Sequence, residues 1–125
     1  MQFLALIYQN EQIQLRFTKE EWGKIYAEYG AVTKELAAQG QLLAGYGLQP
    51  VGKAVTVRSR DGKVSSAEGP AYATEDSLSG VNLIEAPDLE AAARIAAKLP
   101  SVRWGSIEVR PLMDYKSTAE QTYKK

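Results

Sequence analysis

Three charged side chains stand at positions where they could bind a ligand or catalyse a reaction. Glu68 precedes Gly69-Pro70, and a carboxylate at such a turn is a general-base candidate if burial raises its pKa. Glu108 and Arg110 lie two residues apart, which places them on one face of a strand, where Arg110 could hold an anionic or polar group. The alternatives are structural: Glu68 hydrogen-bonds turn amides, and Glu108 and Arg110 take part in a cross-strand or intersubunit ion pair that fixes dimer register.

Aromatic side chains form a second group of candidates. Tyr8, Tyr46 and Tyr72 could each supply a hydroxyl to a pocket, and Tyr8 is the best placed because it ends an apolar strand. The alternative for each is packing with a satisfied hydroxyl. Trp22 and Trp104 are expected to pack in the core or against a strand start.

Composition excludes several kinds of chemistry. The 125 residues include no cysteine and no histidine, which removes thiolate nucleophiles, zinc–thiolate sites and histidine-dependent triads. No nucleotide-binding glycine motif and no carboxylate spacing for a metal occurs, so we expect no cofactor and no metal. Fifteen basic and fifteen acidic residues give a formal net charge of zero, which argues against a nucleic-acid module.

The apolar segments are too short for a membrane span. The N-terminal run stops at Gln9-Asn10-Glu11 and lacks the basic region of a signal peptide. We therefore expect a cytoplasmic protein with no membrane partner.

The first strand, expected over residues 3–8, is apolar on both faces. The two sets are Phe3, Ala5 and Ile7 on one side and Leu4, Leu6 and Tyr8 on the other. Since successive side chains of a strand alternate, both faces of the sheet need cover.

Two helices are indicated by capping residues and apolar spacing. Thr18 and Glu21 have capping-box spacing, and the pattern predicts a helix over residues 19–39. Asp88 is the expected N-cap of a second helix, which stops at Pro100. The expected buried stripes are Trp22, Ile25, Tyr29, Val32 and Leu36 in the first helix and Leu89, Ala92, Ala96 and Leu99 in the second.

Further strands are expected between and after the helices. They cover residues 41–46, 54–59, 64–67, 81–85 and 104–111, and Asp61-Gly62 predicts a two-residue hairpin between the second and third of these. The polar end, residues 116–125, is expected to be a tail, so that residues 1–115 form one domain.

The order of elements resembles the split β-α-β arrangement of ferredoxin-like domains, decorated by a hairpin. This is an α+β fold, in which two helices cover one face of an antiparallel sheet. The opposite face is expected to carry Leu4, Leu6, Tyr8 and Ile84. We predict that a second copy covers it, which gives a homodimer with a small-molecule cleft between the sheets or under the hairpin.

Short segments along the chain resemble the YCII-related proteins, in particular the branch with a DGPF motif, as far as about Tyr115. The matching segments are residues 6–8, 26–30, 47–50, 56–63, 68–70, 83–86, 88–92 and 105–111. The DGPF tetrapeptide reads Glu68-Gly69-Pro70-Ala71 here, followed by Tyr72.

The resemblance implies a dimeric α+β barrel-type fold. It also implies a link to extracytoplasmic-function sigma factors, with whose genes the DGPF branch is often associated. The His–Asp catalytic dyad proposed for wider relatives has no counterpart, because this chain has no histidine.

Three functions follow as hypotheses. The favoured one is a non-catalytic small-ligand-binding or regulatory accessory module. The second is a small isomerase or lyase in which Glu68 or Glu108 is the base, and it requires Glu68, Glu108 and Arg110 to converge on one concave site. The third is a purely structural dimer.

Overall fold

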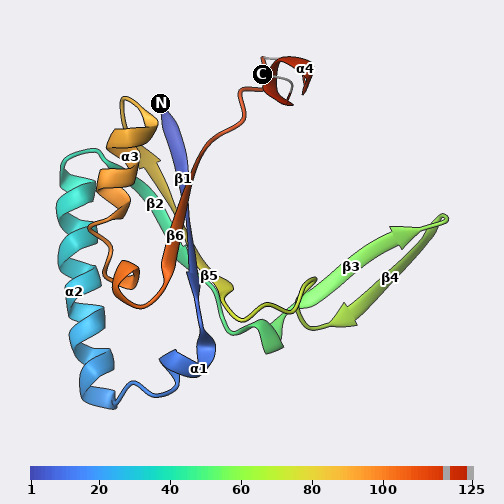
Figure 1. The fold of residues 1–125 in the computed structure, drawn as a ribbon, viewed down its shortest axis with the longest axis horizontal. Coiled ribbons are helices and arrows are strands. Elements are labelled where there is room, and N and C mark those ends of the chain that lie inside the picture. Colours follow the sequence, from blue (N-terminus) through green and yellow to red (C-terminus); the bar gives the residue numbers. More distant parts are fainter. Residues whose placement is uncertain (117–118, 124–125) are drawn as a thin grey trace.

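A four-stranded antiparallel sheet forms the centre of the computed structural model, which describes residues 1–116 and 119–123 (Figure 1). Its strand order is β2-β5-β1-β6. The strands are β1 (Gln2–Gln9), β2 (Leu42–Gly47), β5 (Ser77–Glu85) and β6 (Ser106–Pro111). Helices α2 (Lys19–Ala38) and α3 (Leu89–Ala96) lie together on one side of this sheet. The predicted α+β, ferredoxin-like arrangement is therefore confirmed.

The core lies between the sheet and these two helices. Phe3, Ala5 and Ile7 of β1 are buried there with Leu36 of α2. The prediction for Ile84 was wrong: it is 1% exposed and pairs with Phe3 on the helix-covered face. Both faces of β5 carry apolar residues, so alternation alone could not tell which face meets the helices.

The predicted helix starts are confirmed. Thr18 Oγ1 accepts from Glu21 N, and the Glu21 carboxylate accepts from Thr18 N at 2.9 Å. The Asp88 side chain accepts from Ala91 N at the start of α3. Leu89, expected to be buried, is instead 48% exposed, because the first turn of α3 precedes the part of the helix that packs on the sheet.

A short helix was missed by the sequence analysis. Helix α1 (Glu11–Gln14) follows β1 directly, and the Asn10 side chain caps it by accepting from Gln12 N at 2.8 Å. It carries Glu11 from the end of β1 toward the segment after β2.

The predicted hairpin forms a separate two-stranded sheet of β3 (Val55–Arg60) and β4 (Lys63–Glu68). Asp61 and Gly62 both have positive φ, 52° and 76°, as a two-residue turn between twisted strands requires. The hairpin extends away from the main sheet (Figure 1). Its valines on one face, Val55, Val57 and Val64, are between 62% and 75% exposed.

The C-terminal segment after β6 contains one further element, α4 (Ala119–Tyr123). Residues 117–118 and 124–125 of the predicted tail lie outside the described residues. None of the helices in the described part of the chain is long and apolar enough to cross a membrane.

Candidate functional site

The principal concave feature is a cleft of about 760 Å³ between α2 and the β2 side of the sheet. It opens on the helix-covered side of the sheet. Its lining comes from α1, α2, β2, the segment after β2, β5, the end of β1 and the turn before β6. The lining residues used below are Gln9, Glu11, Trp22, Tyr26, Thr33, Gly45, Tyr46, Ser79, Asn82 and Trp104.

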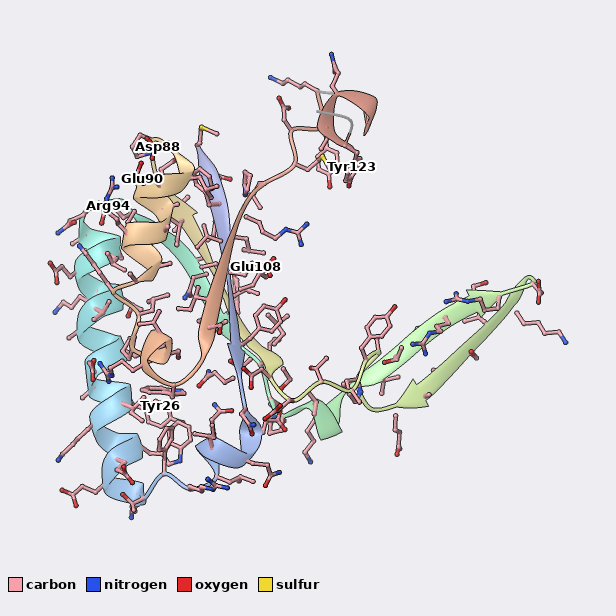
Figure 2. All side chains as sticks on the ribbon, viewed as in Figure 1. Tyr26, Asp88, Glu90, Arg94, Glu108 and Tyr123 are labelled. Atoms are coloured by element: carbon pink, nitrogen blue, oxygen red, sulfur yellow. The ribbon has the colours of Figure 1, made fainter. Side chains whose placement is uncertain are left out.

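One wall of the cleft is aromatic. Trp22 stacks on Tyr26 with ring centroids 5.4 Å apart, and Figure 2 shows Tyr26 on the lower part of α2. Phe17 packs edge-on against both Trp22 and Trp104, at 5.2 and 5.3 Å. This cluster joins the start of α2 to the start of β6, and it offers flat apolar surface to a ligand.

A chain of hydrogen bonds fixes the polar side chains at the end of β1. Trp104 Nε1 donates to Gln9 Oε1 at 2.5 Å, and Gln9 Nε2 donates to Ser79 Oγ at 2.6 Å. Ser79 Oγ in turn donates to the Ile7 carbonyl at 3.2 Å. The buried Gln9 amide is therefore satisfied at both its oxygen and its nitrogen.

Asn82 differs from Gln9 in this respect. It lies on β5 between Ala5 and Gly45 and is 8% exposed, yet its side-chain amide makes no hydrogen bond within residues 1–116 and 119–123. Gly45 makes room for it, because a Cβ there would lie 2.3 Å from Asn82 Oδ1. The amide atoms of Asn82 are not fully enclosed, so water in the cleft can reach them.

The cleft carries little formal charge. Glu11 is its carboxylate, and the lining includes no lysine or arginine. Glu11 Oε2 accepts from Val51 N at 2.9 Å and is 3.5 Å from Ser77 Oγ. The carboxylate is thus engaged in holding the segment after β2 against the segment after β1.

Of the predicted ligand-binding residues, Tyr46 contributes to the lining of this cleft. Its register partner is Val81, so its side chain, which is 67% exposed, lies on the face of the sheet away from the helices. Tyr8 lies half-buried on the opposite face of the sheet, paired in register with Ser106 and Leu78. Tyr72 is 81% exposed, in the connection after the hairpin.

Glu108 and Arg110 lie on the face of the sheet away from the helices, with Glu108 labelled in Figure 2. Arg110 Nε is 3.7 Å from Glu108 Oε2, and both side chains are more than half exposed. This ion pair lies within one strand and is therefore neither the cross-strand nor the intersubunit pair named as the alternative, and exposed pairs contribute about 0–1 kcal/mol. Neither side chain lines the cleft.

Glu68 is exposed at the end of β4, on the other sheet. The turn after it is held by other residues: Thr56 Oγ1 donates to the Gly69 carbonyl and Arg58 Nη2 to the Ala71 carbonyl. The Glu68 carboxylate makes no hydrogen bond within the described ranges. The structure thus brings Glu108 and Arg110 together and leaves Glu68 on a different sheet.

Sequence reasoning missed the buried polar residues of the cleft, although a signal for them exists. Asn82 shares the face of β5 with Ile84, and Gln9 continues the face of Phe3, Ala5 and Ile7. A polar side chain at a core-facing position of a strand needs a partner, so each was a candidate for a site.

An ion pair joins α2 to the turn before β6. Arg103 donates to both carboxylate oxygens of Glu28 on α2, through Nη2 at 2.8 Å and through Nη1. The Arg103 guanidinium also lies 5.5 Å from the centre of the Trp104 ring. These hydrogen bonds lower the pKa of Glu28 below its ordinary value and raise that of Arg103.

The pKa shift of Glu28 predicts a pH-dependent contribution to stability. Because the folded-state pKa is the lower one, the stabilisation is present above the unfolded-state pKa and is lost as pH falls through the folded-state value. Glu28→Gln should therefore be less stable than the wild type near neutral pH and nearly equal to it at about pH 3. Urea unfolding at both pH values measures the difference, and a difference independent of pH would contradict the prediction.

Within residues 1–116 and 119–123, no group of three or more histidine, cysteine, aspartate or glutamate side chains could hold a metal ion. The site is therefore a mainly apolar cleft, with an aromatic wall and a buried amide, beneath the helices of a ferredoxin-like sheet.

Comparison with known proteins agrees with this class of fold. The model of the YCII-related domain matches residues 1–116, and the chain belongs to this family. A relative in Rhizobium meliloti (strain 1021), the uncharacterized protein R00369, is 31% identical over 118 residues. That alignment covers 93% of this chain and 95% of the relative.

Proposed function

We propose that the protein is a small-ligand-binding module whose ligand lies in the cleft between α2 and the sheet. The observation that carries this proposal is the cleft itself: its volume of about 760 Å³ lies in the range of small-molecule sites. Its apolar lining with a few buried polar groups is also typical of such sites. In this proposal the ligand lies beneath the helices rather than between two sheets.

A non-catalytic role has more support than the enzyme alternative. The residues proposed as base and electrophile, Glu68, Glu108 and Arg110, do not line the cleft. The carboxylate that does, Glu11, is engaged by Val51 N, which leaves it poorly placed to take a proton from a substrate.

We also propose that the protein is a homodimer in which the open sheet faces meet. Leu4, Leu6 and Tyr8 of β1 lie on that face and are only half-buried in a single chain. The face continues onto β5 with Val81 and Leu83. Contiguous apolar surface of this kind is usually covered in soluble proteins.

The family branch, the location and the regulatory partner are also proposals. We propose membership of the DGPF branch, on the Glu68-Gly69-Pro70 remnant, a cytoplasmic location, and a regulatory link to a sigma-factor system. A purely structural dimer would leave the cleft without a ligand, so the test of binding also separates that alternative.

Indole binding tests the proposed site. The chain has two tryptophans, and both line the cleft, so their two indole N–H signals in heteronuclear NMR spectra report directly on it. We expect indole to shift both signals with a dissociation constant of about a millimolar or below.

A matched pair of variants on α2 supplies the control. Thr33 lines the cleft and its neighbour Lys34 is exposed. Thr33→Trp should fill the cleft and weaken indole binding at least about tenfold, whereas Lys34→Trp should leave it unchanged. The introduced tryptophan adds a third indole signal to each variant, and comparison with the wild-type spectrum identifies it. No shift in the wild type, or equal affinity in both variants, would contradict the proposal.

A further inference from the structure

The buried amide of Asn82 indicates which hydrogen-bonding groups a ligand carries, and the size of the cleft does not. Its side chain is 8% exposed, lines the cleft and has no hydrogen-bond partner within residues 1–116. A buried amide retains the capacity for both donation and acceptance. A group that reaches the bottom of the cleft can therefore gain hydrogen bonds that water otherwise supplies.

The residues on either side of Asn82 in the sheet leave its amide accessible from the cleft. Its cross-strand neighbours are Ala5 on β1 and Gly45 on β2, two of the smallest residues. The amide lies over Gly45 so closely that a Cβ would meet Oδ1 at 2.3 Å. Small neighbours on both sides leave the space above the amide to a ligand.

Several other polar groups around the cleft are already engaged. Trp104 Nε1 and both amide atoms of Gln9 belong to one hydrogen-bonded chain with Ser79. The Tyr29 hydroxyl is hydrogen-bonded to Ser101 Oγ. Among the buried polar side chains that line the cleft, Gln9 and Asn82, only Asn82 makes no hydrogen bond within residues 1–116.

The charge of the lining selects against an anion. Glu11 contributes a carboxylate, and no lysine or arginine lies along the cleft to balance a second negative charge. Removing an anion from water without a counter-ion is costly. The flat faces of Trp22 and Tyr26 instead favour a planar, neutral ring.

We propose that the cleft takes a neutral planar aromatic ligand with an adjacent hydrogen-bond donor and acceptor, such as a carboxamide or lactam edge, which Asn82 recognises. The inference rests on the proposed function, that the cleft binds a small molecule. Asn82 is then a specificity-determining residue, because a matching ring without that edge would leave its amide unpartnered.

Three probes of nearly the same shape test this class. Benzamide carries the donor and acceptor, acetophenone only the acceptor, and benzoate a negative charge. Shifts of the indole signals of Trp22 and Trp104 measure each affinity. We expect benzamide to bind about tenfold more tightly than acetophenone, and benzoate to bind most weakly.

Two variants test whether Asn82 causes the preference for benzamide over acetophenone. Asn82→Leu removes the amide at similar size, and Gly45→Ala displaces it by the added Cβ. Each should reduce the preference for benzamide over acetophenone to nearly one. Since the amide has no partner within residues 1–116 and can bond to water in the open cleft, Asn82→Leu should unfold at nearly the same temperature as the wild type.

The outcomes separate this inference from the proposed function. If no neutral ring shifts the indole signals, the proposed binding site fails. If benzamide and acetophenone bind equally and Asn82→Leu has no effect, the cleft binds rings but Asn82 does not select them. Tighter binding of benzoate would overturn the inferred charge. If Asn82→Leu fails to fold, Gly45→Ala still decides the question.

Discussion

Phe3→Ala should lower the free energy of unfolding by about 3–5 kcal/mol, the largest stability effect that we expect of a single side chain. Phe3 is 1% exposed on the central strand β1, where it pairs with Ile84 on one side and Pro111 on the other. Truncation leaves a cavity between the sheet and the helices, and strands paired on both sides cannot move in to close it. Since domains of this kind are stable by about 5–15 kcal/mol, a measurable fraction of the variant could be unfolded.

Urea unfolding, followed by circular dichroism at one fixed protomer concentration, measures the effect. A fixed concentration matters because dimer formation would add to the apparent stability. Phe3→Leu keeps most of the buried volume and should lose clearly less. Val64→Ala, at a hairpin position that is 75% exposed, should change stability by less than about 0.5 kcal/mol. A loss below about 1 kcal/mol in Phe3→Ala would mean that the core is not organised around this side chain.

The parts of the fold that were predicted correctly depend on local chemistry. Thr18 and Glu21 cap α2 by bonds that span three residues, and Asp88 caps α3 in the same way. Asp61 and Gly62 close their turn because their own backbones reach positive φ. Each of these signals can be read in a short window, independently of the rest of the fold.

The cleft depends on contacts between residues far apart in the chain, and for that reason the sequence analysis did not place it. Gln9, Ser79 and Trp104 meet across separations of 70 and 95 residues. The start of α2 is joined to the turn before β6 through Phe17, which packs against both Trp22 and Trp104. Trp22 was assigned to the core by its spacing, but it is half-buried and lines the cleft.

Charged residues were poor guides to the residues that line the cleft. Glu108 and Arg110 share a strand face and form an ion pair within that strand, but the face is turned away from the helices. Charged side chains usually lie where water reaches them. A polar but uncharged residue at a core-facing position, as with Asn82, was the more informative signal.

The proposed dimer predicts a large effect of one charge on the open face of the sheet. Leu6 lies near the middle of β1, where its register partners are Val81 on β5 and Glu108 on β6. In a single chain Leu6→Arg is tolerable, because the side chain is only half-buried and the guanidinium can reach water. Between two sheets the guanidinium would lose its water, and an ion pair with Glu108 would not repay that cost, so we expect the dimer to dissociate at least about a hundredfold more readily.

Sedimentation equilibrium across micromolar to submillimolar concentrations measures this effect. The wild type should have twice the chain mass of 13.7 kDa, and Leu6→Arg should have the mass of one chain with unchanged circular dichroism. Val64→Arg carries the same charge on the exposed hairpin and should remain dimeric. A monomeric wild type would contradict the dimer. If Val64→Arg dissociates and Leu6→Arg does not, the copies meet through the hairpin, because a charge disrupts only the surface that becomes buried.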